Sequence, residues 1–140
     1  MNIKSNDATL NRPNGERFID APYVLTNFNE VIYQLQQEGA WQKSDRNAIT
    51  IFKTEGTSIV AGALREGSVI SDNITEGLIS IQVLKGTILV ETELNADPVT
   101  INTGELFSMH REFSHSIKAA KDSFLLLTIA GSNNFKQTIS

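Results

Sequence analysis

The side chains in this sequence best suited to acid–base or metal chemistry are its two histidines, His110 and His115. An imidazole titrates near neutral pH, so either residue could move a proton or ligate a metal ion. With only two histidines, a site that needs three imidazoles from one chain is excluded. Cysteine is absent, which excludes a disulfide framework, a thiolate nucleophile and zinc or iron–sulfur sites held by cysteine.

Other signatures of chemistry are missing. The carboxylates show no paired spacing on one strand face, as a glycosidase would need, and G-x-S-x-G, P-loop and G-x-G-x-x-G motifs do not occur. Twelve basic and 16 acidic residues give a net charge of −4 without a basic stripe, so we expect no nucleic-acid partner. A polar N-terminus and the lack of a long apolar run lead us to expect a cytoplasmic protein with no membrane contact.

The elements that position these residues begin with one helix. With 140 residues the chain has the length of a single domain. Asn27 and Glu30 are typical of a helix N-terminus, and Gly39 of a helix end, so we predict a helix over residues 28–38. Its apolar stripe consists of Phe28, Val31, Ile32 and Leu35. Trp41 could form a binding rim with Arg46, or it could pack beneath this helix.

Short β-rich runs separated by turn signals fill the rest of the sequence, which predicts an all-β sandwich or barrel. The runs are residues 48–53, 58–64, 78–84, 87–92, 99–102, 105–109, 116–120 and 124–130. The last run is apolar on both faces, so its outside must be covered by the helix or by another subunit, and we expect a homodimer. The expected divisions are a polar arm (1–17), a helix-containing cover segment (18–47), a barrel (48–132) and a tail (133–140).

Two motifs carry a resemblance to a known family. The first is L-R-E-G-S-V-I-S-D-N-I-T-E-G-L-I-S-I-Q-V-L-K-G at residues 64–86, and the second is G-E-L-F-S-M-H-R-E-F-S-H-S-I-K-A at residues 104–119. In their internal spacing and separation they resemble the two motifs of a small single-domain cupin with the RmlC-like jelly roll. The resemblance implies an all-β, cupin-type double-stranded β-helix barrel, here with one N-terminal helix.

The same resemblance implies where a metal would be held. Metal-binding cupins use two histidines and a glutamate from the first motif and one histidine from the second. In this sequence those positions correspond to Asn73, Thr75, Ile79 and His115. A register change by one residue would place Asp72 at the first of them. One imidazole provides too few ligands for a catalytic divalent ion, so we expect no metal and no cofactor.

In the cupin register, His115 points into the barrel and provides one titratable group in an apolar pocket. The expected pocket residues are His115, Asn73, Thr75, Ile79, Ile81, Phe107, Met109 and Ile117, with His110 at the mouth. Such a pocket suits a small organic ligand. Two alternatives remain open: an isomerase-, epimerase- or lyase-like enzyme that uses His115 as general base, and a structural or interaction domain with a filled core.

Overall fold

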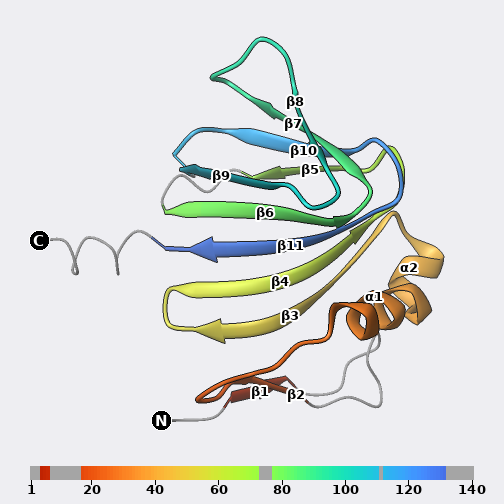
Figure 1. Ribbon diagram of the computed structural model, residues 1–140, viewed down its shortest axis with the longest axis vertical. Helices are drawn as coiled ribbons and strands as arrows, with labels where there is room; N and C mark the ends of the chain where they lie inside the picture. The colour runs from red at the N-terminus through yellow and green to blue at the C-terminus, as the bar shows by residue number, and fades with distance from the viewer. Residues whose placement is uncertain (1–3, 7–16, 73–76, 111, 132–140) are drawn as a thin grey trace, which may run out of the picture.

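The computed structural model describes residues 4–6, 17–72, 77–110 and 112–131, with side chains from residue 21 onward except that of Asp72. These residues form eleven strands and two helices (Figure 1). Their bounds are β1 Lys4–Asn6, β2 Arg17–Asp20, α1 Phe28–Gln37, α2 Gly39–Lys43, β3 Arg46–Thr54, β4 Thr57–Leu64, β5 Val69–Asp72, β6 Leu78–Lys85, β7 Thr87–Thr92, β8 Val99–Asn102, β9 Leu106–His110, β10 His115–Ala119 and β11 Ser123–Ala130.

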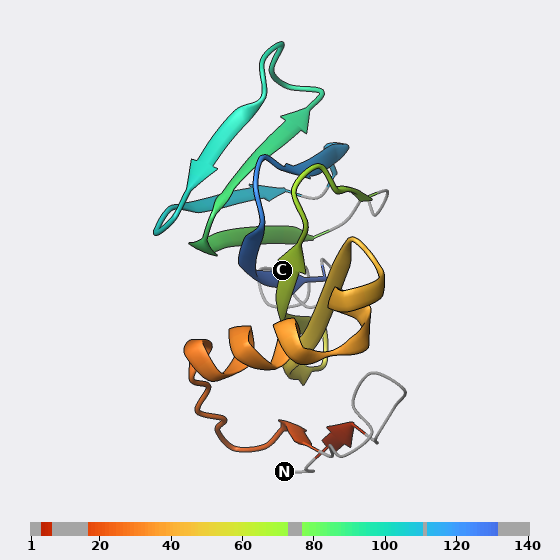
Figure 2. The same ribbon diagram turned by 90° about the vertical axis from the view of Figure 1, so that its right-hand side faces the viewer.

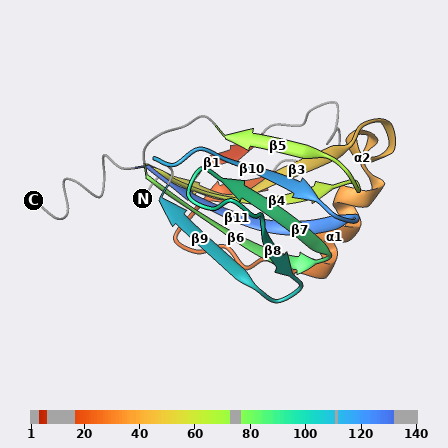
Figure 3. The same ribbon diagram turned by 90° about the horizontal axis from the view of Figure 1, so that it is seen from above.

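Two antiparallel sheets make up the barrel. The five-stranded sheet has the order β3-β4-β11-β6-β9, and the four-stranded sheet has the order β5-β10-β7-β8. Seen from above, strands of both sheets extend along a common direction, with α1 and α2 gathered at one end of them (Figure 3). The β1–β2 pair forms a separate two-stranded sheet. This all-β architecture with a short N-terminal helix is the one the sequence predicts.

The first core lies between the two sheets. Its residues alternate along their strands, so each strand of the barrel turns one set of apolar side chains inward. Five members are fully buried, at 0% exposure: Ile81, Val83, Ile88, Val90 and Ala119. The burial of these five side chains fixes the strand register within the two sheets, because a shift by one residue would turn them outward.

A second core lies on the outer face of the five-stranded sheet, beneath the helices. Asn27 begins α1, and its Oδ1 accepts a hydrogen bond from the Glu30 backbone N–H at 3.2 Å. The residues of this core are Leu35, Trp41, Ile49, Ala61, Ala63 and Phe124. Figure 2 shows α1 and α2 between the barrel strands and the β1–β2 pair. The helix therefore covers part of the outer face for which the apolar β11 sequence required a cover.

The second helix, α2, was not expected from the sequence. Gly39 opens this short helix as well as following α1, and Trp41 lies on its buried side at 5% exposure. The Trp41 and Phe124 ring centroids are 5.6 Å apart. The Arg65 guanidinium carbon lies over the Trp41 ring, 3.8 Å from its centroid. Of the two interpretations of Trp41, the structure therefore shows packing beneath the helices and not a binding rim.

A buried polar contact fastens α1 to β3. The Asn47 side-chain amide donates to the Leu35 carbonyl oxygen at 3.1 Å and to Glu38 Oε1 at 2.8 Å. The Gln34 amide donates to the other Glu38 carboxylate oxygen at 3.2 Å. Because Asn47 and Glu38 are both buried, these hydrogen bonds satisfy groups that would otherwise lose their hydration without compensation.

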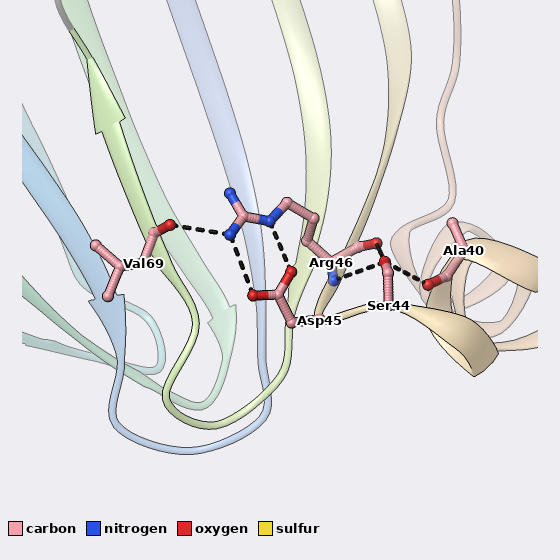
Figure 4. Close-up of polar contacts among 5 residues, drawn as sticks. All are labelled: Ala40, Ser44, Asp45, Arg46 and Val69. Atoms are coloured by element: carbon pink, nitrogen blue, oxygen red, sulfur yellow. Dashed lines mark hydrogen bonds and ion pairs between the residues drawn. The ribbon is translucent and has the colours of Figure 1, made fainter.

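Strand β5 was also missed by the sequence analysis, although it forms one edge of the four-stranded sheet. Arg46, at the start of β3, reaches this edge: its Nη2 donates to the Val69 carbonyl oxygen at 3.0 Å (Figure 4). The same guanidinium holds the Asp45 carboxylate in a bidentate pair at 2.9 and 3.1 Å. Hydrogen bonding from Arg46 lowers the pKa of Asp45, and the carboxylate in turn raises that of Arg46.

Candidate functional site

His115 is the first residue of β10, and its place in the ladder determines which way it faces. His115, Ile117 and Ala119 alternate on one face of the strand and are all buried, at 6%, 3% and 0% exposure. Ile117 and Ala119 belong to the core between the sheets. His115 therefore lies on the inner face of the barrel, as the sequence analysis expected.

The backbone register places two polar residues beside His115. It pairs with Asp72 of β5 on one side and with Thr92 of β7 on the other. Thr92 Oγ1 accepts a hydrogen bond from the Leu94 backbone N–H at 3.1 Å, so its hydroxyl is engaged in the turn that follows β7. The next inward row, formed by Ile70, Ile117 and Val90, is apolar. The row directly inward of His115 is therefore apolar in all three of these strands.

The interior is packed more tightly at one end than at the other. Leu125 of β11 is 1% exposed, whereas the next inward residues of the same strand, Leu127 and Ile129, are half-buried. Phe107 and Met109 of β9 are half-buried as well. The half-buried residues lie toward the end where β6 begins and β11 ends, on the left in Figure 1. His115 starts its strand at this same end, where it is 6% exposed and both of its ring nitrogens are buried.

The expected pocket residues separate into three groups. Five of them lie on the inner face with His115 and belong to or pack against the core: Ile79, Ile81, Phe107, Met109 and Ile117. His110 ends β9 at the same end of the barrel, but it is exposed and alternates with Phe107 and Met109, which places it on the opposite face of the strand. Asn73 and Thr75 lie outside the described residues.

Among the described residues, the side chains around His115 do not provide the donors of a catalytic divalent ion. The position that the cupin resemblance assigns to the carboxylate ligand is Ile79, an apolar side chain at 4% exposure. Within the described part of the chain, no three His, Cys, Asp or Glu side chains come together as a metal site would require. Three protein ligands are the usual minimum for catalytic zinc. What His115 can provide is a hydrogen bond or a proton, at the edge of an apolar surface.

Sequence reasoning missed two hollows on the outer face of the five-stranded sheet. The larger, of about 330 Å³, is lined by Val24, Leu25, Thr26, Asn27, Glu30, Val31, Gln34, Ile49, Thr50 and Ile51. The other, of about 270 Å³, is lined by Val24, Thr26, Phe28, Ile51, Phe52, Ile59 and Leu126. Residues 23–25 form a short run of Tyr, Val and Leu, which was the one sequence signal for a segment that lies against the barrel here.

Solved structures of other proteins share this architecture. A cupin 2 conserved barrel domain protein from Leptotrichia buccalis matches 81% of this chain over 51% of its own, with a TM-score of 0.65 and 18% identity. An RmlC-like cupin from Desulfovibrio desulfuricans matches 61% of this chain over 81% of its own, with a TM-score of 0.52 and 26% identity. This chain has the fold of a small cupin. A conserved Streptococcus pyogenes protein of unknown function matches 64% of this chain over 76% of its own, with a TM-score of 0.57 and 16% identity.

By sequence, no protein-family model matches this chain, and no curated protein does either. The likeness to cupins is therefore one of fold. Neither of the described helices has the length and apolar character needed to cross a membrane.

Proposed function

We propose that this chain binds a small organic molecule at the open end of its barrel, against the inner face beside His115. The observation that carries the proposal is the exposure gradient along β11, from Leu125 at 1% to the half-buried Leu127 and Ile129. Large apolar side chains that face inward and still meet solvent offer a surface that an apolar ligand would cover.

In this proposal His115 orients the ligand through a hydrogen bond and does not hold a metal ion. An imidazole can donate from one ring nitrogen and accept at the other, so it suits a ligand with a hydroxyl, carbonyl or carboxylate group. Phe107, Met109 and Leu127 would contact the apolar body of the ligand. The apolar Ile79 at the carboxylate position supports a metal-free role, because coordination by one imidazole is weak.

The test is a two-dimensional NMR titration of the histidine side chains with octanoate as the probe. The sequence has two histidines, so His115 can be assigned by comparison with the His110→Gln variant, which also serves as the matched control. We expect octanoate to shift the His115 signals, and His115→Gln to weaken binding while His110→Gln does not. No binding of octanoate by the native protein, or equal binding by both variants, would contradict the proposal.

The metal-free part has its own measurement. Elemental analysis of protein purified without chelator is expected to find less than stoichiometric transition metal. A metal ion bound at full occupancy and lost in His115→Gln would overturn this part of the proposal.

A second candidate function is catalysis with His115 as general base. The observation that favours it is the β5–β10 register, which pairs Asp72 directly with His115 in the sheet. In known triads a carboxylate orients the catalytic imidazole, and Asp72 is the acidic residue that the backbone register pairs with His115. If a turnover is found, His115→Ala should abolish it and Asp72→Asn should reduce it. Unchanged turnover in His115→Ala would refute this assignment.

A further inference from the structure

The two hollows on the outer face of the five-stranded sheet adjoin each other. Val24, Thr26 and Ile51 line both of them, so the hollows meet where the segment before α1 lies beside β3. Their volumes are about 330 and 270 Å³, and pockets of a few hundred Å³ are typical of small-molecule sites. Together they have room for one small molecule that extends from one hollow into the other.

The two hollows differ in polarity. The larger, which we call the polar hollow, is lined along α1 by the side chains of Asn27, Glu30 and Gln34. The smaller, which we call the apolar hollow, has four lining residues that the polar hollow lacks, and all four are apolar: Phe28, Phe52, Ile59 and Leu126. A molecule that occupies both hollows therefore needs one polar end and one apolar end.

The polar hollow presents hydrogen-bond acceptors. Glu30 and Gln34 lie four residues apart on α1 and so share one face of the helix. The Gln34 side-chain nitrogen donates to the Glu38 carboxylate at 3.2 Å, and the oxygen of the same amide is an acceptor. A carboxylate and an amide oxygen are best matched by a positively charged group that donates several hydrogen bonds. A primary ammonium group has these properties.

The charge at the polar hollow also favours a cation. Of the described residues that line the two hollows, Glu30 is the only charged one, so no lysine or arginine there would repel an ammonium group. The N-terminus of α1 has the opposite preference, but a helix dipole amounts to only about half an elementary charge. Its Glu30 N–H is also capped by Asn27 Oδ1. The full charge of the Glu30 carboxylate therefore determines which sign of ligand is attracted.

We propose that the two outer hollows bind a small arylalkyl amine, with its ammonium group at Glu30 and Gln34 and its ring in the apolar hollow. Phe28 and Phe52 line the apolar hollow, and aromatic rings attract each other beyond the area that they bury. This site lies on the outer face of the five-stranded sheet, whereas His115 lies on the inner face of the barrel. The amine site is thus independent of the ligand site proposed beside His115.

The test is calorimetric titration of the native chain, at low ionic strength, with phenethylamine and with 3-phenylpropionate. The two probes have the same ring and the same two-carbon spacer but opposite charges. We expect phenethylamine to bind with a dissociation constant of about 1 mM or lower, and 3-phenylpropionate at least about tenfold more weakly. Added salt should weaken the binding of phenethylamine, because Glu30 is exposed and its charge is screened.

The variant that tests the ammonium contact is Glu30→Gln, which keeps the shape of the side chain and removes its charge. It should weaken phenethylamine binding about tenfold, the loss expected when a charge-assisted hydrogen bond becomes a neutral one. Its circular dichroism spectrum should remain that of the native chain, because Glu30 is exposed. The matched control is Glu91→Gln, which removes the same charge from an exposed position on β7 and should bind phenethylamine like the native chain.

The position of the bound amine is read from backbone amide NMR signals. Phenethylamine should shift the signals of Val31 and Ile51, which line the polar hollow, and leave that of Ile117 in the barrel core unchanged. The proposal is overturned if phenethylamine fails to bind at about 10 mM, if 3-phenylpropionate binds equally well, or if Glu30→Gln binds like the native chain. Shifts confined to Ile117 and its neighbours would also overturn it, because they would place the amine inside the barrel.

Discussion

Two leucines on one strand test whether the barrel is filled at one end and open at the other. Leu125 and Leu127 lie two residues apart on β11 and both face the core between the sheets. Leu125 is 1% exposed, whereas Leu127 is half-buried. Replacing a fully buried leucine by alanine removes its burial and leaves a cavity, which costs about 3–4 kcal/mol in a core that cannot collapse. At Leu127 we expect about 1–2 kcal/mol, because less area leaves water and solvent can fill the space.

The assay is thermal unfolding of Leu125→Ala, Leu127→Ala and the native chain, followed by circular dichroism. At about 3 °C per kcal/mol for a chain of this size, the melting temperatures should fall by about 10 °C and about 4 °C. Equal losses for the two variants would refute the reasoning, because they would mean that the interior is filled along its whole length. That result would favour a structural or interaction role over ligand binding.

The remaining predictions concern a turn and an ion pair. Gly86→Ala should lower the melting temperature strongly, because Gly86 has φ +111° and an added Cβ would collide with Ser123. Gly104→Ala is the control and should lower it less, because Gly104 has φ +87° but open space around it. An equal loss in the two variants would contradict this account. Acidification should weaken the contact between β3 and β5. The hydrogen bond from Arg46 lowers the pKa of Asp45 in the folded protein. The ion pair therefore stabilises the folded protein fully at a pH above the ordinary aspartate pKa. This stabilisation is lost as the pH falls through the lowered pKa of Asp45. Asp45→Asn should remove this part of the pH dependence, seen in acid titrations of stability, and an unchanged titration would contradict it.

The parts of the fold that the sequence predicts are those with strong local signals. Asn27 caps α1 and the apolar stripe through Leu35 gives it a buried face, so the helix lies within one residue of the prediction. The long strands follow from runs of β-branched and apolar residues between glycine turns. The sequence analysis missed strand β5, because its four residues include the polar Ser71 and Asp72. Pairing with β10 holds this strand in place, and no local sequence pattern indicates that pairing.

The candidate site follows the same division. The inward direction of His115 follows from strand alternation and the cupin register, and the structure places it there. The sequence alone could not show on which face of β9 His110 lies. Side chains alternate between the two faces of a strand, so an error of one residue in the strand register places His110 on the opposite face. The position of the two outer hollows was not predictable, since they form where Val24 and Thr26 lie near Ile51 of β3, far along the chain.

The core beneath the helices determines how much of the chain is needed for it to fold. A shortened protein that starts at β3 would lose Leu35 and Trp41 and leave Ile49, Ala61 and Phe124 facing water. It would also leave the Asn47 amide without the carbonyl and carboxylate to which it donates. The smallest autonomous folding unit therefore begins no later than α1, and the helices unfold together with the strands as one cooperative body.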